Sequence, residues 1–162
     1  MLVPAIIRKD EILSAFQKLL YSNELFYYTG YPACNELPAI KCENGIYQYA
    51  IVDSDNKLIG FFQYHINLVM DTVDMFGLIS FDIGNITVTL DAMQKMQELI
   101  RDHRRVTWNC IEGNPVSRVY DRICFHYNGY KSIMHKCTRN DRGEYLDSYV
   151  YEILNGGISR ED

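Results

Sequence analysis

Apolar residues recur along this chain at two different periods, and the period changes from one segment to the next. Runs rich in β-branched and aromatic residues predict strands at 46–52, 58–68 and 73–83, with short polar turns between them. A shorter apolar run at 2–7 predicts one more strand. Three strands joined by such short turns indicate an antiparallel meander.

Helical spacing marks three other segments. One helix is predicted to open at Asp10 and end near Ser22, and a second to run from Thr89 to Asp102. The third, at 115–127, is the clearest because its apolar residues follow one stripe of a helix. Those residues are Val116, Val119, Tyr120, Ile123, Cys124 and Tyr127.

The ends of this third helix carry signals of their own. Asn114 is a good N-cap, and Pro115 suits the first helical position, where a missing N–H costs nothing. Gly129 is expected to take the left-handed conformation that ends a helix.

Strands at 105–111, 130–138 and 145–154 complete an order of β-α-loop-β-β-β-α-β-α-β-β. This order predicts an α+β fold with one mixed, mostly antiparallel sheet flanked by helices. Residues 1–155 are expected to form a single domain, and residues 156–162 a loose tail.

Composition narrows the classes of partner. The 162 residues carry a net charge of −5 with no basic patch, so neither nucleic acid nor an anionic membrane is an expected partner. No apolar run approaches the length of a membrane span. The five cysteines form no C-x-x-C pair, which is typical of reduced thiols in a cytoplasmic protein. The four histidines have no metal-ligand spacing with the cysteines, so no metal site is expected.

One run in the C-terminal half resembles a known family. It reads Gly113-Asn114-Pro115-Val116-Ser117-Arg118-Val119-Tyr120 and is followed by Asn128-Gly129-Tyr130. Together with the element order, this run resembles the GNAT superfamily of acyl-CoA N-acyltransferases over residues 5–154, most strongly over 77–137. Phe81-x-x-Gly84-Asn85-x-Thr87-Val88 is similar to a subset often seen in phage and bacterial genomes.

The resemblance implies transfer of an acetyl group from acetyl-CoA to a primary amine of a small molecule or a protein. A gap between the fourth and fifth strands would receive the pantetheine arm, and a backbone N–H between Phe81 and Ile83 would polarise the thioester carbonyl. Tyr120 would protonate the departing thiolate. The helix that follows the fourth strand would bind the pyrophosphate at its N-terminus. The residues assigned to the cofactor are Phe81, Ile83, Asn85, Ile86, Thr87, Val88, Thr89, Asn114 and Tyr120.

The pyrophosphate loop departs from the family pattern, which is Gln/Arg-x-x-Gly-x-Gly/Ala. The chain reads Gly84-Asn85-Ile86-Thr87-Val88-Thr89-Leu90, with one glycine, no cation and several β-branched residues. This departure keeps a second hypothesis open, in which the domain is a non-catalytic binding or assembly module with the same fold.

Four residues have two interpretations at this stage. Spacing alone makes Tyr120 a core aromatic, and Asn114 is fully explained as a helix cap. Asp82 is assigned as a general base beside the thioester, with Glu112 as another candidate. The sequence favours a solvated surface group for either carboxylate, because no pattern indicates burial or a neighbour that would raise its pKa.

The segments that would bind the acceptor amine or form an oligomer contain no recognisable motif. Three tyrosines of the connection before residue 45 either border the acceptor amine or cover the sheet as packing; they are Tyr27, Tyr28 and Tyr31. The edge strands and the C-terminal hairpin are compatible with a homodimer.

Overall fold

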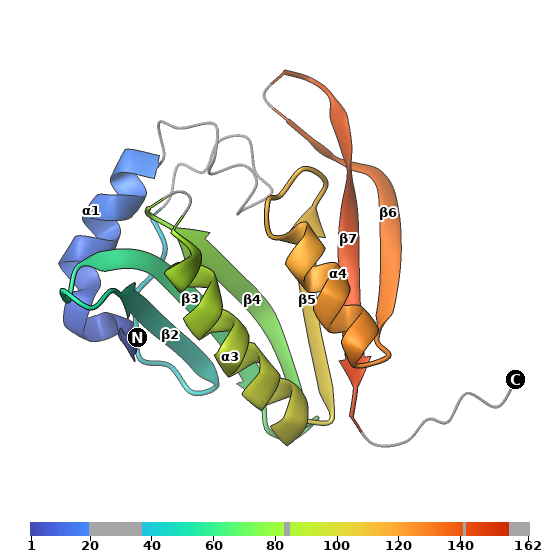
Figure 1. Ribbon diagram of the computed structural model, residues 1–162, viewed down its shortest axis with the longest axis horizontal. Helices are drawn as coiled ribbons and strands as arrows, with labels where there is room; N and C mark the ends of the chain where they lie inside the picture. Colours follow the sequence, from blue (N-terminus) through green and yellow to red (C-terminus); the bar gives the residue numbers. More distant parts are fainter. Residues whose placement is uncertain (20–36, 83–84, 141, 156–162) are drawn as a thin grey trace, which may run out of the picture.

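The computed structural model describes residues 1–19, 37–82, 85–140 and 142–155. They form one seven-stranded sheet with helices on both faces (Figure 1). The strand order is β1-β2-β3-β4-β5-β7-β6, and neighbouring strands are antiparallel except β4 and β5, which are parallel. The predicted α+β class, with its mixed and mostly antiparallel sheet, is confirmed.

The elements follow the predicted order. The strands are β1 (Leu2–Pro4), β2 (Ile46–Val52), β3 (Leu58–Asn67), β4 (Thr72–Ser80), β5 (Arg105–Ile111), β6 (Tyr130–Arg139) and β7 (Tyr145–Leu154). The helices are the short 3-10 helix η1 (Ala5–Arg8), α1 (Lys9–Leu19), α3 (Ile86–Asp102) and α4 (Ser117–His126). Some predicted site residues and the expected C-terminal tail lie outside the described residues; the site residues are Tyr27, Tyr28, Tyr31 and Ile83.

Three boundaries differ from the sequence analysis by three residues. The first strand ends at Pro4 rather than residue 7, because Ala5–Arg8 form the 3-10 helix η1. The other two lie between β4 and α3. The predicted strand through Ile83 is wrong, because β4 ends at Ser80, whose hydroxyl accepts the Asp82 N–H at 3.3 Å and turns the chain. The predicted helix start at Thr89 is also late. α3 begins at Ile86, because the Asn85 side chain caps it by accepting the Thr87 N–H at 3.1 Å.

Two apolar cores lie on opposite faces of the sheet. Beneath α3 and α4, a large core gathers residues of both helices and of β2 to β5 and β7, among them Phe62, Met96 and Trp108. A smaller core lies between α1 and strands β2 to β4 and includes Phe16 and Phe61. Figure 1 shows α3 and α4 side by side on one face, with α1 at the β1 edge of the sheet.

The C-terminal end of α4 corrects one prediction. Asn128, not Gly129, takes the left-handed conformation, with a φ of 51°, and the Gly129 N–H then donates to the Cys124 carbonyl at 2.7 Å. Gly129 is needed for a different reason, which is close packing against β7. A Cβ added to it would lie 2.7 Å from the Glu152 carbonyl oxygen and 2.9 Å from the Ile153 side chain.

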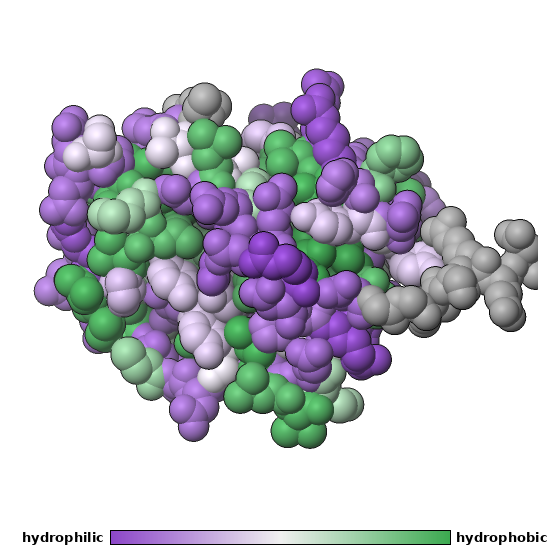
Figure 2. All heavy atoms as spheres, turned by 60° about the horizontal axis from the view of Figure 1, so that its bottom comes forward, coloured by the Kyte–Doolittle hydropathy of each residue, from purple (hydrophilic) through white to green (hydrophobic). Residues whose placement is uncertain are grey.

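Apolar side chains at the surface are dispersed rather than continuous. Figure 2 shows hydrophobic residues on one face in several patches with hydrophilic residues between them. The most exposed are Leu68 and Val69 in the β3–β4 turn and Phe125 on α4. Within the described ranges, no helix is both long and apolar enough to cross a membrane.

Candidate active site

The parallel pair β4 and β5 meets over a short stretch and then separates. Thr72 pairs with Arg105 and Val73 with Val106, and no later residue of either strand pairs across this junction. β4 continues to Ser80 paired with β3 alone, and β5 continues to Ile111 paired with β7 alone. We call this gap in the pairing, between residues 74–80 and 107–111, the slot.

A β-bulge in β4 lies directly after the last pair with β5. Opposite β3, the register changes between Gln63 and His65, where β4 has one extra residue. Met75 in this stretch has a φ of 53°, which is uncommon for a residue with a long side chain. A bulge bends its strand and increases the local twist, so this one turns β4 away from β5.

The pairing pattern decides which peptide groups face the slot. The Phe81 N–H donates to the Ile59 carbonyl on β3 at 2.9 Å, so it points away from β5 and cannot polarise a thioester in the slot. Because peptide groups alternate along a strand, those of Leu78 and Ser80 point toward β5 instead. The Phe81 N–H is therefore excluded from the predicted role, and the peptide groups that face the slot are those of Leu78 and Ser80.

Aromatic side chains meet across the slot on the helix-covered face. Phe76 of β4 and Trp108 of β5 have ring centroids 6.5 Å apart. Trp108 stacks on Tyr151 of β7, with centroids 5.2 Å apart and an interplanar angle of 7°. The Tyr120 ring contacts both, at 5.8 Å from Trp108 and 5.9 Å from Tyr151. The slot is thus lined on this face by rings, and Tyr120 belongs to that lining.

Tyr120 is held as a neutral phenol. The residue is 6% exposed, and burial, followed by the nearby Cys110, raises the pKa of its hydroxyl well above the ordinary value. The hydroxyl makes no hydrogen bond with the part of the chain that the structure describes, yet its oxygen is not among the fully buried unpaired atoms. It therefore keeps a proton and some accessible surface at neutral pH. Both properties suit a proton donor.

The turn that leads into α4 is organised by Asn114. The Ile111 carbonyl accepts the Asn114 N–H at 3.0 Å, and Gly113 takes the positive φ of 88° that this turn requires. The buried Asn114 side chain accepts the Val116 N–H at 3.0 Å. α4 begins at Ser117, two residues later than predicted, because this turn precedes it. The prediction that Asn114 is the N-cap and Pro115 the first helical residue is therefore wrong: Val116 holds the N-cap position without a side-chain cap bond, and Asn114 stabilises the turn before it.

Both helices that flank the slot begin at its open end, since each follows one of the two separating strands (Figure 1). At the start of α3, Asn85 donates from its side chain to the Asp82 carboxylate at 3.1 Å. Its side-chain oxygen accepts the Thr87 N–H. The N-terminus of α3 is therefore already capped by Asn85 and has the Asp82 carboxylate beside it.

Solved structures share this fold. No family model matches the sequence, and no curated protein does. A GCN5-related N-acetyltransferase from Kribbella flavida superposes with a TM-score of 0.71 at 14% identity, covering 96% of this chain and 97% of that one. A Vibrio cholerae spermidine N-acetyltransferase in complex with CoA and spermine has a TM-score of 0.66 at 14% identity, covering 95% and 94%. The chain has the GNAT fold. In a second Vibrio cholerae structure, a spermidine/spermine N-acetyltransferase, the match covers 69% of this chain and 66% of that one, with a TM-score of 0.55 at 15% identity.

The side chains of the predicted pyrophosphate loop divide between core and surface. In this GNAT fold Val88 is 2% exposed and belongs to the large core, so only its backbone can meet a ligand. Thr87 is exposed, Thr89 is half-buried, and Ile86 opens the helix. Asp82, the predicted general base, is half-buried and bonded to Asn85. Its catalytic role stays a prediction.

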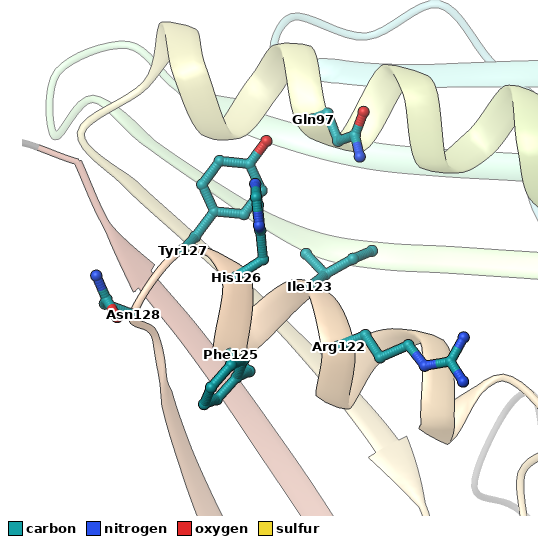
Figure 3. Close-up of a pocket in the computed structure, with 7 residues that line it drawn as sticks. All are labelled: Gln97, Arg122, Ile123, Phe125, His126, Tyr127 and Asn128. Atoms are coloured by element: carbon teal, nitrogen blue, oxygen red, sulfur yellow. The ribbon is translucent and has the colours of Figure 1, made fainter.

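A pocket of about 640 Å³ lies between the two helices of the GNAT fold that flank the slot (Figure 3). Gln97 of α3 points across it toward Ile123 of α4 and toward Tyr127, the residue directly after α4. The Arg122 guanidinium extends back along α4 toward the open end of the slot. Among the described residues, Arg122 forms no ion pair, and no group of three His, Cys, Asp or Glu side chains could hold a metal ion.

Several residues of this site escaped the sequence analysis. Leu78 and Ser80 carry no motif, because their role comes from backbone direction after a bulge that the sequence does not announce. Arg122 was overlooked because a single arginine on a helix is usually a solvated surface group. Trp108 had one available signal, since it is the only tryptophan of the chain.

Proposed function

We propose that this protein is an acyl-CoA-dependent N-acyltransferase that moves an acetyl group from acetyl-CoA to a primary amine. The observation that supports this most is the slot, where a peptide-lined gap in the sheet lies beside a buried, protonated phenol. A chain with amides along its length fits the unpaired peptide groups of Leu78 and Ser80. The GNAT fold makes acyl transfer the first chemistry to test at such a gap.

The residues of the slot divide the reaction between two strands and one helix. A backbone N–H of Leu78 or Ser80 polarises the thioester carbonyl as negative charge develops on its oxygen. The acceptor nitrogen forms the new C–N bond as the C–S bond breaks, and Tyr120 gives its proton to the departing thiolate sulfur. The proton lost by the amine leaves through a base, for which Asp82 is the candidate, and Tyr120 regains a proton from solvent.

The phosphate end of the co-substrate would be held differently from the usual family pattern. The α3 N-terminus offers N–H groups, but the Asn85 cap and the Asp82 carboxylate already occupy part of it. Arg122 is a cation without an ion-pair partner among the described residues, and it extends toward the same end of the slot. We therefore assign to Arg122 the positive charge that the loop at 84–90 lacks.

A non-catalytic binding module is the second candidate function. The specific observation in its favour is the self-capped start of α3, where a resident carboxylate repels an incoming pyrophosphate. A homodimer through the edge strands also remains a proposal, compatible with either function. The two functions differ in whether the slot accepts coenzyme A.

Thermal unfolding with and without CoA separates the two. A ligand that binds only the folded state adds RT ln(1 + [L]/Kd) to stability, so acetyl-CoA and CoA at millimolar concentration should raise the Tm. Release of free thiol from acetyl-CoA in the presence of a panel of primary amines then tests transfer. No Tm shift at millimolar CoA would favour the binding module, and a shift without thiol release on any amine would leave the acceptor open while supporting the slot.

A further inference from the structure

One buried polar atom beside the slot has no partner. Of the fully buried side-chain nitrogen and oxygen atoms in the described ranges, only the Trp108 Nε1 lacks a hydrogen bond. Trp108 is 2% exposed, so bulk water does not reach the indole. Native proteins leave very few buried donors unpaired, because an unpaired donor loses its bond to water and gains nothing in return.

The position of Trp108 connects this atom to the slot. It lies on β5 two residues beyond Val106, the last residue that pairs with β4. Its ring reaches from Tyr151 on one side to Phe76 of β4 on the other, across the stretch where the strands have separated. The Tyr120 ring, which carries the proposed acid, packs against the same indole. Any chain that enters the slot therefore runs beside Trp108.

Chemistry narrows what the indole can recognise. The indole N–H is a donor and never an acceptor, so its partner must offer an oxygen or nitrogen lone pair. Hydrogen bonds are stronger in the dry surroundings that this side chain has, and an unmade one costs more there. A carbonyl oxygen of a bound ligand fits both requirements.

We propose that the Trp108 N–H donates a hydrogen bond to a carbonyl oxygen of the pantetheine–thioester arm in the slot. This inference rests on the proposed function and adds a binding residue to it. It also gives Trp108 a role distinct from that of Tyr151, the ring on which it stacks, because the Tyr151 hydroxyl already donates to Asp121 at 2.8 Å.

Because the chain has a single tryptophan, the indole N–H signal of the wild-type protein reports directly on Trp108. In ¹⁵N-labelled protein one indole N–H resonance is expected, and titration with CoA should move its proton signal downfield as the hydrogen bond forms. Acetyl-CoA provides a second arm of the experiment. A shift with CoA itself assigns the acceptor to a pantetheine amide, and a shift with acetyl-CoA alone assigns it to the thioester carbonyl; both results support the proposal.

Trp108→Phe keeps an aromatic ring and removes the donor. We expect its Kd for the same ligand, measured by calorimetry, to rise roughly five- to tenfold. The substitution removes no hydrogen bond from the ligand-free protein, so no part of any change in its Tm should come from a lost hydrogen bond. Tyr145→Phe, on an exposed side chain of the β6–β7 hairpin, is the matched control and should leave Kd unchanged.

The outcomes separate this inference from the proposed function. Wild-type protein that binds CoA without moving the indole resonance, or a Trp108→Phe variant that folds and binds with wild-type affinity, overturns the inference alone and points to a buried water as the partner. Wild-type protein that binds neither CoA nor acetyl-CoA overturns both.

Discussion

The two halves of the sheet, on either side of the β4–β5 junction, are covered differently. β2, β3 and β4 contribute to both cores, under α1 on one face and α3 on the other. In the other half, α4 packs on one face, and the edge strand β6 is exposed at every position except Thr138. Only two residue pairs connect β4 to β5 by strand pairing, whereas β3 and β4 are paired along most of their length.

This difference places unpaired backbone in the middle of a sheet rather than at its edge. Peptide groups of Leu78 and Ser80 would need a partner strand that has turned away, and buried peptide groups are almost always paired. In the proposed function, the first half would supply the backbone groups that bind the co-substrate, and the second half the Tyr120 side chain. The proposed chemistry requires both, so each prediction below alters one half or the contact between them.

The largest expected effect comes from removing the proton donor of the second half. Tyr120→Phe should lower kcat by about 10²- to 10⁴-fold, the range for a positioned general acid. Kd for CoA should change little, because the hydroxyl is not a binding group in this mechanism. Thiol release gives kcat, and calorimetry gives Kd.

The pKa of Tyr120 sharpens this test. Burial raises the pKa of the phenol, so it stays protonated as the pH rises past the ordinary tyrosine value, and deprotonation of Tyr120 should not limit activity on the alkaline side. Tyr145→Phe removes an exposed phenol and serves as the control. An unchanged kcat in Tyr120→Phe would return Tyr120 to the core as packing alone.

A second prediction concerns how the second half is packed. Gly129→Ala forces a methyl group to within 2.7 Å of the Glu152 carbonyl oxygen, so we expect the free energy of unfolding to fall by about 1–3 kcal/mol. Asn128→Gly is the matched control. Asn128 already holds a positive φ, so glycine there should be close to neutral in denaturant titrations. A Gly129→Ala variant as stable as the wild type would mean that β7 does not pack this closely against residue 129.

These neighbours illustrate what the sequence predicts well. The period of the apolar residues predicts most strands and helices, because burying one face takes every second residue of a strand and every third or fourth residue of a helix. The run at 2–7 is an exception, since its second half forms the 3-10 helix η1. Asn128-Gly129 also announces a helix end correctly. Which of the two takes the left-handed conformation depends on the distance to β7, and that distance is a tertiary property.

The candidate site was predictable in type but not in its backbone contacts. Tyr120 and Asn114 lie in a recognisable run, and the parallel pair follows from the element order. The Phe81 prediction failed because β4 ends at Ser80 and the Phe81 N–H pairs with β3, and neither the end of the strand nor the one-residue bulge near Met75 can be read from the apolar pattern. No residue type or spacing in the sequence marks such a bulge.

A smaller effect is expected at the open end of the slot. Arg122→Gln removes the cation that extends toward this end, and we expect Kd for CoA to rise about fivefold, because exposed charge pairs contribute modestly. The difference should shrink at high ionic strength, where exposed charges are screened. Arg142→Gln makes the same charge change in the exposed β6–β7 turn and should leave Kd unaltered. Equal rises in Kd for both variants would mean that Arg122 acts only through the net charge of the protein and not through its position.

The smallest effect is expected at the closed end, where Asp71 links the two halves. Its carboxylate accepts from His103 Nδ1 at 2.9 Å and from the Arg104 N–H at 3.0 Å, and its carbonyl accepts the Arg105 N–H at 3.3 Å. The bond from His103 and then that from Arg104 lower the pKa of this carboxyl below its ordinary value.

A lowered pKa in the folded state stabilises the protein only while the carboxyl is ionised. The contribution of Asp71 is therefore fully present above the ordinary aspartate pKa of about 4 and is lost as the pH falls through the lowered value. The Tm difference between wild type and Asp71→Asn should be small, constant from neutral pH down to about 4, and should vanish below that.

Asp147→Asn is the control in the second half, far from the junction. The Asp147 carboxylate accepts from the Lys136 backbone N–H and from His135 Nδ1. Both variants should lose their Tm difference in acid, but only Asp71→Asn should also weaken CoA binding at neutral pH, because only Asp71 fixes the point from which the strands separate. Equal CoA affinity in the two variants would mean that the bulge alone sets the width of the slot.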